Sequence, residues 1–98
     1  MDLSSLTETG FILLGLMQQP VHGYEMMEKV DQYFKGSFRI GPATLYTSLK
    51  QLHKANLCQI EVDGKRKIYT LTESGKALFN EAKALKIQML KFIDEGGQ

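Results

Sequence analysis

The sequence has few of the residues on which disulfide-bonded, membrane-spanning or exported proteins depend. Its 98 residues include one cysteine, two prolines and no tryptophan. A lone cysteine excludes an intramolecular disulfide and is typical of a reducing compartment. No apolar run approaches the roughly 18 residues of a membrane-spanning helix, and Met1-Asp2-Leu3-Ser4 lacks the cationic and apolar segments of an export signal. We therefore expect a cytoplasmic protein that has no contact with membranes.

Motifs of catalysis and metal binding are also missing. The two histidines and Cys58 do not have the spacing of zinc ligands. The nine glycines form no phosphate-binding loop, and neither a Gly-x-Ser-x-Gly nor a His-Glu-x-x-His motif occurs. We therefore expect a protein that is not an enzyme and that uses neither a metal nor another cofactor.

Positive charge is concentrated in the middle of the chain. The net charge is +1, but residues 35–67 hold seven lysines and arginines against two carboxylates, whereas the rest holds five lysines against nine carboxylates. A basic centre between acidic ends attracts a polyanion to one face. The same asymmetry also arises by chance in short chains, so charge alone does not identify the partner.

The first half of this single domain reads as two helices and a short extended piece. Residues 7–17 are apolar nearly all round, which is typical of a buried helix, and Pro20 follows its end. A second helix over residues 23–34 places Tyr24 on one face with Met27, Val30 and Phe34. Residues 38–40 form the extended piece.

A third helix, over residues 42–55, has the most informative surface. Pro42 stands at its first position, where the missing N–H costs nothing. Leu45, Leu49 and Leu52 have the spacing of a buried stripe. The polar residues left outside are Thr44, Thr47, Ser48, Lys50, Gln51 and Lys54. No carboxylate occurs between Asp31 and Glu61, whereas a generic solvated helix mixes both signs, so this face favours a negatively charged partner.

The second half of the chain predicts a hairpin and a long helix. Residues 57–62 and 67–71 resemble strands, joined by Asp63-Gly64 as a tight turn. Lys65, Arg66 and Lys67 follow, so we expect three consecutive cations at the tip of the hairpin. Thr72 then caps a helix of about 23 residues, about 34 Å long, more than so small a domain can cover.

The last helix carries an apolar seam. Leu78, Ala82, Leu85, Met89 and Phe92 follow heptad spacing. Leu78 and Ala82 are expected to pack on the chain's own core, but little apolar material remains to cover the residues beyond Lys83. We therefore predict that a second copy of the chain covers Leu85, Met89, Leu90, Phe92 and Ile93.

This order of elements is that of a winged helix-turn-helix, a mainly α (α+β) fold with a long C-terminal dimerisation helix. In this module the third helix enters a DNA major groove, and the hairpin is the wing. We predict DNA contacts from Thr44, Thr47 and Lys50, and contacts of Lys65, Arg66 and Lys67 with the flanking backbone or minor groove. Tyr24 and Tyr46 either pack at the edge of the core or contact a phosphate.

Three motifs in order resemble the PadR family of bacterial transcriptional regulators, over roughly residues 10–80. They are His22-Gly23-Tyr24-Glu25 after Ile12-Leu13-Leu14-Gly15-Leu16, then Thr44-Leu45-Tyr46 with Leu49 and Leu52, then Ile68-Tyr69-Thr70-Leu71-Thr72-Glu73-Ser74-Gly75. The short tail is similar to the smaller branch of that family. Thr47 departs from the family's usual proline, and Asn56 from its usual glycine, although asparagine also adopts left-handed geometry.

The resemblance implies a homodimeric repressor that binds a pseudo-palindromic operator in double-stranded DNA and pairs through its C-terminal helix. Residues 1–75 would form the DNA-binding domain and residues 76–98 the dimerisation helix. A small-molecule effector is a further expectation, and the methionines either pack in the core or line its pocket. The alternative is a winged helix that binds protein instead of DNA, in which the basic tip of the hairpin would matter little.

Overall fold

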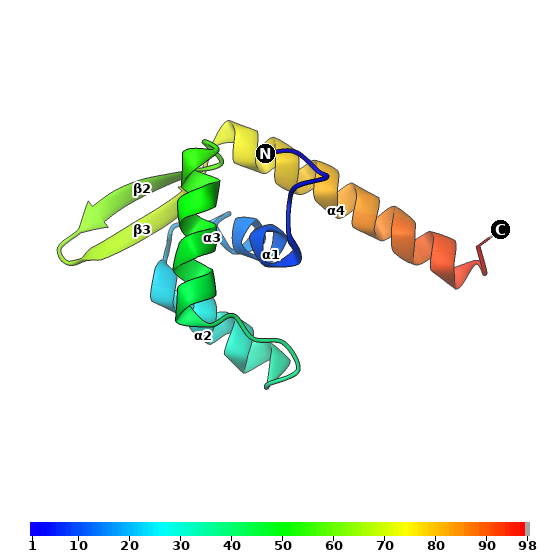
Figure 1. Cartoon of the computed structure of the whole chain (residues 1–98), viewed down its shortest axis with the longest axis horizontal. Coiled ribbons are helices and arrows are strands. Elements are labelled where there is room, and N and C mark those ends of the chain that lie inside the picture. Colours follow the sequence, from blue (N-terminus) through cyan, green and yellow to red (C-terminus); the bar gives the residue numbers. More distant parts are fainter. Residues whose placement is uncertain (98) are drawn as a thin grey trace.

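The computed structural model describes residues 1–97, which form four helices and an antiparallel sheet of three strands (Figure 1). In chain order the elements are α1 (Glu8–Leu16), β1 (Val21–His22), α2 (Gly23–Phe34), α3 (Pro42–Lys54), β2 (Cys58–Asp63), β3 (Arg66–Leu71) and α4 (Glu73–Asp94). This arrangement confirms the predicted winged helix-turn-helix, in which the β2–β3 hairpin is the wing.

Hydroxyl side chains fix where α1 and α4 begin. Thr7 Oγ1 accepts a hydrogen bond from the N–H of Gly10 at 2.9 Å, and Thr72 Oγ1 accepts one from the N–H of Gly75 at 3.0 Å. Each bond satisfies a backbone donor that the first turn of a helix leaves unpaired. The observed bounds confirm all four predicted helices, whose ends lie within about one residue of the expected positions.

One core lies between α1, α2, α3 and the inner face of the sheet. Leu45, Leu49 and Leu52 of α3 are buried, as their spacing predicts. The other elements contribute Leu13, Leu14, Met17, Val21, Met26, Val30, Cys58, Tyr69 and Leu71. Met17 and Met26 are therefore packing residues, and Tyr69 also lies in the core.

The buried face of α2 differs from the prediction. It consists of Gly23, Met26 and Val30, whereas Tyr24 is 62% exposed. A Cβ at position 23 would lie 3.2 Å from the ring of Tyr46, so the glycine face of the helix packs closely against α3. Tyr24 therefore points outward, so of the two roles predicted for it, packing at the edge of the core is contradicted and contact with a phosphate stays a prediction.

The third strand of the sheet comes from an unexpected segment. β3 pairs antiparallel with β1 and β2, so the strand order is β1-β3-β2. Val21 pairs with Tyr69 and His22 with Ile68. Residues 38–40, expected to be extended, form no strand in the described chain. A strand of two residues has no alternation to reveal it, and only its pairing with β3 defines it.

The wing turns one residue later than the sequence predicts. Asp63, the last residue of β2, pairs with Arg66, the first of β3, so the turn consists of Gly64 and Lys65. Gly64 has a φ of +64°, which glycine adopts without strain. Lys65, Arg66 and Lys67 are all exposed; the first lies in the turn and the other two open β3. The predicted run of three consecutive cations therefore lies at the tip, with Lys65 in the turn and the other two at the start of β3.

The start of α4 is held tightly against the preceding chain. Thr72 donates its hydroxyl to the carbonyl of Asn56 at 2.7 Å and its backbone N–H to the carbonyl of Leu57 at 3.1 Å. A Cβ at Gly75 would overlap the Leu57 carbonyl oxygen, so only glycine fits there. Asn56 has a φ of +62°, the left-handed geometry expected for it. These contacts set the direction in which α4 leaves the body.

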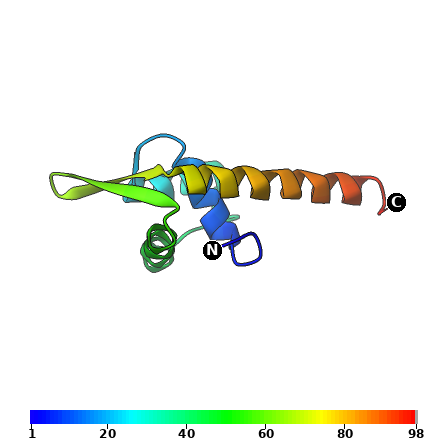
Figure 2. The same cartoon turned by 90° about the horizontal axis from the view of Figure 1, so that it is seen from above.

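The second half of α4 extends beyond the body of the domain (Figure 1). The molecule measures 53 × 31 × 21 Å, and the wing and the free end of α4 point away from each other along the longest axis (Figure 2). Leu78 and Ala82 are buried against the core, as predicted. None of the helices in residues 1–97 combines the length and apolar character that crossing a membrane requires.

Candidate nucleic-acid interface

The outer face of α3 is polar and exposed. Thr44, Thr47 and Lys50 are exposed, while Leu45 and Leu49 between them are buried. Thr47 and Lys50 lie on the side of the helix opposite its buried leucines, and Lys54 continues the stripe by one turn. The stripe therefore presents a hydroxyl and two ammonium groups to solvent, with no carboxylate on the helix.

The backbone at the start of α3 adds to this positive character. No acidic side chain lies in its first turn, and Gly41 at the N-cap offers no side chain to the free N–H groups. The N-terminus of a helix carries a partial positive charge. Ile40, just before the helix, is 5% exposed and anchors the segment in the core. The first turn is therefore fixed in place and free to accept an anionic partner.

A cleft of about 630 Å³ joins the wing to the first turn of α2 and the side of α3. Lys65, Arg66 and Lys67 line it from the wing. The other lining residues are His22, Gly23, Tyr24, Glu25, Glu28, Tyr46 and Tyr69. Both views show α3 and the wing at the same end of the molecule, opposite the free end of α4 (Figures 1 and 2). The cationic wing and α3 thus border one hollow.

Three tyrosines from three elements contribute to the cleft in different ways. Tyr24 is 62% exposed, Tyr46 is 49% exposed and Tyr69 is 4% exposed. Burial and then the neighbouring Tyr46 raise the pKa of Tyr69, so its hydroxyl stays protonated. Tyr24 and Tyr46 can offer their hydroxyls to a partner, whereas Tyr69 supports the floor of the cleft.

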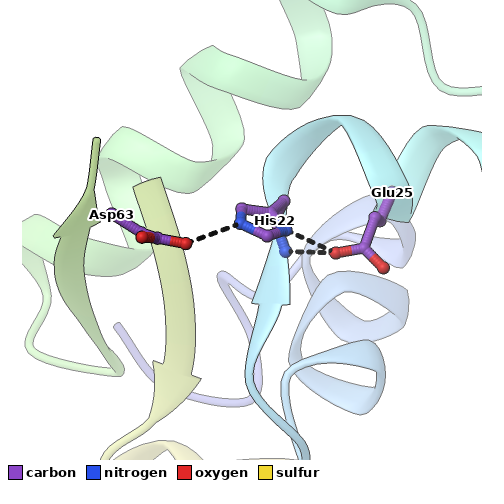
Figure 3. A network of polar contacts seen from close by, with 3 residues as sticks. All are labelled: His22, Glu25 and Asp63. Atoms are coloured by element: carbon purple, nitrogen blue, oxygen red, sulfur yellow. Dashed lines mark hydrogen bonds and ion pairs between the residues drawn. The ribbon is translucent and has the colours of Figure 1, made fainter. Parts of the chain in front are cut away.

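His22 connects the two sides of this cleft (Figure 3). Its Nδ1 lies 2.7 Å from Oε1 of Glu25, and its backbone N–H donates to the same oxygen at 3.0 Å. On the other side, Nε2 lies 3.9 Å from Oδ2 of Asp63, at the end of β2. The backbone N–H of His22, and then its ring, hold the pKa of the Glu25 carboxyl below its usual value.

Sequence reasoning missed this contact between α2 and the wing. His22 and Glu25 have the spacing of an N-cap and its third helical residue, which predicts the first half of the contact. Asp63 lies 41 positions further along the chain than His22, so no local spacing of residues predicts the second half of the contact. Only the pairing of β1 with β3 brings the end of the wing to this histidine.

The far end of the molecule carries an exposed apolar face. Leu85, Met89, Leu90, Phe92 and Ile93, the residues expected to mediate dimerisation, are between 38% and 67% exposed. This is the uncovered state that the sequence predicts for one copy of the chain. An exposed row of large apolar side chains marks a surface that a partner covers in most soluble proteins.

An apolar groove of about 440 Å³ lies between α1 and α2 and reaches Phe79 of α4. The rings of Phe11 and Phe79 stack in it with centroids 5.1 Å apart, and the ammonium of Lys86 lies 5.0 Å from the Phe11 centroid. Its other lining residues are Ile12, Gly15, Leu16, Lys29, Val30, Tyr33 and Phe34. Tyr33 is 80% exposed, so the groove opens to solvent.

The remaining candidates for reactive chemistry are buried or scattered. Cys58 is 2% exposed, and burial raises the pKa of its thiol to about 11, which keeps it protonated and unreactive at neutral pH. Within residues 1–97 no three histidine, cysteine, aspartate or glutamate side chains gather as metal ligands would.

Comparison with known proteins identifies a family and a fold. The sequence matches the transcriptional regulator PadR-like family over residues 12–81. An uncharacterised protein from Lysinibacillus sphaericus is 30% identical over 88 residues, which cover 85% of this chain and 81% of that protein.

Solved structures have the same architecture. A transcriptional regulator from Clostridium thermocellum aligns with a TM-score of 0.80 and 20% identity, over 89% of this chain and 87% of that one. Bacillus subtilis PadR in complex with operator DNA aligns with a TM-score of 0.63 and 23% identity, over 74% of this chain and 45% of that one. At these identities the likeness shows a shared winged-helix fold.

Proposed function

Because the chain belongs to the PadR-like family of transcriptional regulators, we propose that it binds double-stranded DNA as a homodimer and represses transcription from an inverted-repeat operator. Each subunit places α3 in a major groove and the wing on the adjoining backbone or minor groove. The residues proposed to contact DNA are Tyr24, Thr44, Tyr46, Thr47, Lys50, Lys65, Arg66 and Lys67.

The main support for DNA binding is that the cationic wing borders the same cleft as Tyr46 of α3. DNA presents phosphates on both sides of its major groove, so a protein that inserts a helix needs cations beside that helix. The wing supplies such cations on the cleft that Tyr46 of α3 borders, and α3 itself carries no carboxylate that would repel DNA.

The roles within the interface follow from position. Thr47 and Lys50, opposite the buried leucines, are assigned to base edges, because they are the side chains that point into the groove. Thr44, one turn before Lys50, is assigned to the same surface. Tyr46 and Tyr24 flank the cleft, where their hydroxyls donate to a phosphate.

Dimerisation is assigned to the second half of α4. Residues 1–75 act as the DNA-binding unit and residues 76–98 as the dimerisation helix, of which Gln98 lies outside the described residues. The apolar row from Leu85 to Ile93 supports this division, because nothing in residues 1–97 covers it. A twofold dimer would place the two α3 helices about 34 Å apart, one turn of DNA.

A small apolar effector is the proposed regulator. The groove beside Phe11 and Phe79 supports it, because its walls are apolar and lie next to the dimerisation helix. A ligand bound there would alter the spacing of the two α3 helices and so release the operator.

Binding to the promoter of the protein's own gene, measured over a series of salt concentrations, tests the DNA-binding proposal. Four or five cationic contacts per subunit predict that log K falls with log[salt] at a slope of roughly −7 to −9. A slope near zero contradicts DNA binding. It would favour the alternative of a protein-binding module, in which removing the wing cations leaves function intact.

A further inference from the structure

We infer that His22 is a positioning residue that ties the end of the wing to the first turn of α2, and that this tie, and with it the grip on DNA, strengthens when the imidazole is protonated. The inference rests on the proposed DNA-binding function. His22 itself is only partly exposed, at 25% of its side chain, and it lines the cleft beside the residues proposed to contact DNA.

The contact with Glu25 fixes which ring nitrogen carries the first proton. A carboxylate only accepts hydrogen bonds, so Nδ1 of His22, at 2.7 Å from Oε1 of Glu25, is the donor. In the neutral imidazole, Nε2 then carries a lone pair. Nε2 is buried and has no hydrogen-bond partner in the described chain.

The same nitrogen faces the wing (Figure 3). Oδ2 of Asp63 lies 3.9 Å away, too far for a hydrogen bond but close enough for an ion pair. While the ring is neutral, the lone pair of Nε2 faces the carboxylate oxygen of Asp63, and neither atom can donate a hydrogen bond to the other. Protonation places an N–H and a positive charge on the ring, so the histidine is then attracted to a carboxylate on each side. The end of the wing is drawn toward α2.

The charge of Asp63 matters for DNA as well. Asp63 pairs with Arg66 across the wing, so the two side chains project from the same face of the hairpin, and Arg66 is one of the cations proposed to contact phosphates. A protonated His22 offsets this negative charge, which favours the approach of DNA. The ring contacts Glu25 of α2 and Asp63 of β2. The other charged and titratable groups of the cleft that it lines are Glu28 and Tyr24 of α2, Lys65 of the turn, Arg66, Lys67 and Tyr69 of β3, and Tyr46 of α3.

The pH range in which histidines change charge, about 5 to 8, allows a direct test. We would measure fluorescence anisotropy of a labelled duplex from upstream of the protein's own gene, at constant ionic strength, at about pH 5.5 and about pH 7.5. An exposed ion pair corresponds to about a threefold effect, so two wings predict about tenfold tighter binding at the lower pH. Glu25 stays ionised across this range because its pKa is lowered.

Matched variants isolate the contact. His22→Gln and Asp63→Asn are each expected to abolish the pH dependence, and Asp63→Asn also to tighten binding at both pH values. His53→Gln removes the other histidine, which is exposed on α3, and should leave the pH dependence intact. Glu61→Gln removes a carboxylate two residues before Asp63 on the same face of β2, and should also leave it intact.

The outcomes separate the inference from the function on which it rests. A pH dependence that survives in His22→Gln, or that disappears equally in Glu61→Gln and Asp63→Asn, overturns the tie while DNA binding stands. If the wild type binds no duplex at either pH, the proposed function fails and the inference fails with it. Circular dichroism checks that each variant is folded. If His22→Gln does not fold, the pH dependence of Asp63→Asn alone tests the tie between His22 and the wing.

Discussion

Removing two cations from the wing should change the salt dependence of DNA binding by a predictable amount. Lys65 lies in the turn and Arg66 opens β3, and both are exposed on the cleft that Tyr46 borders. Lys65→Ala with Arg66→Ala removes two charges per subunit and four per dimer. At about 0.9 counterions per phosphate contact, the slope of log K against log[salt] should become less negative by about 3.6.

The intact protein has a predicted slope of roughly −7 to −9, so the double variant should give roughly −3.5 to −5.5. The loss of binding affinity should be equal for promoter and scrambled duplexes, because phosphate contacts carry no sequence information. Filter binding or anisotropy over a salt series would provide both slopes.

A matched control removes the same charge elsewhere. Lys76→Ala with Lys83→Ala takes two cations from the face of α4 opposite Leu78 and Ala82. These lysines lie away from the cleft, so this variant should keep the wild-type slope. An unchanged slope in the wing variant, or an equal change in the control, would refute the assignment of the wing to the DNA backbone.

Three further predictions concern the fold, the dimer and sequence reading. Gly75→Ala should destabilise the protein by about 3 kcal/mol, because the added Cβ meets backbone, while Gly41→Ala, with open space around it, should cost much less by thermal unfolding. Leu85→Asp with Met89→Asp should yield monomers by light scattering and abolish promoter binding, and an intact dimer would rule out the α4 interface. Lys50→Ala should both weaken binding and reduce the preference for promoter over scrambled duplex; equal losses on both would assign Lys50 to phosphates instead.

Local signals in the sequence explain how much of the fold was predictable. Threonine caps at Thr7 and Thr72, and Pro42 at the start of α3, mark helix starts through interactions within a few residues. The spacing of the leucines in α3 is enough to predict which side of that helix is buried. Such features depend on neighbours along the chain, so they are available before any tertiary structure is known.

The sequence-based expectations for the side of α2 that Tyr24 occupies and for the turn of the wing differ from the structure because of contacts between elements. Tyr24 fits the apolar face of an isolated helix, but α2 packs against α3 through Gly23, where the lack of a side chain leaves room for the ring of Tyr46. That contact rotates Tyr24 outward. The turn of the wing likewise depends on the register of β2 with β3, which moves it from Asp63-Gly64 to Gly64-Lys65.

The sequence by itself determined the order of the elements, the uncovered apolar end of α4 and the carboxylate-free face of α3, because periodicity and composition act along the chain. Only the tertiary structure decided which residues meet across the cleft. β1 exists through its pairing with β3, and that pairing brings His22 within 3.9 Å of Asp63. Contacts between residues so distant in sequence depend on how the elements pack, which no local pattern of residues records.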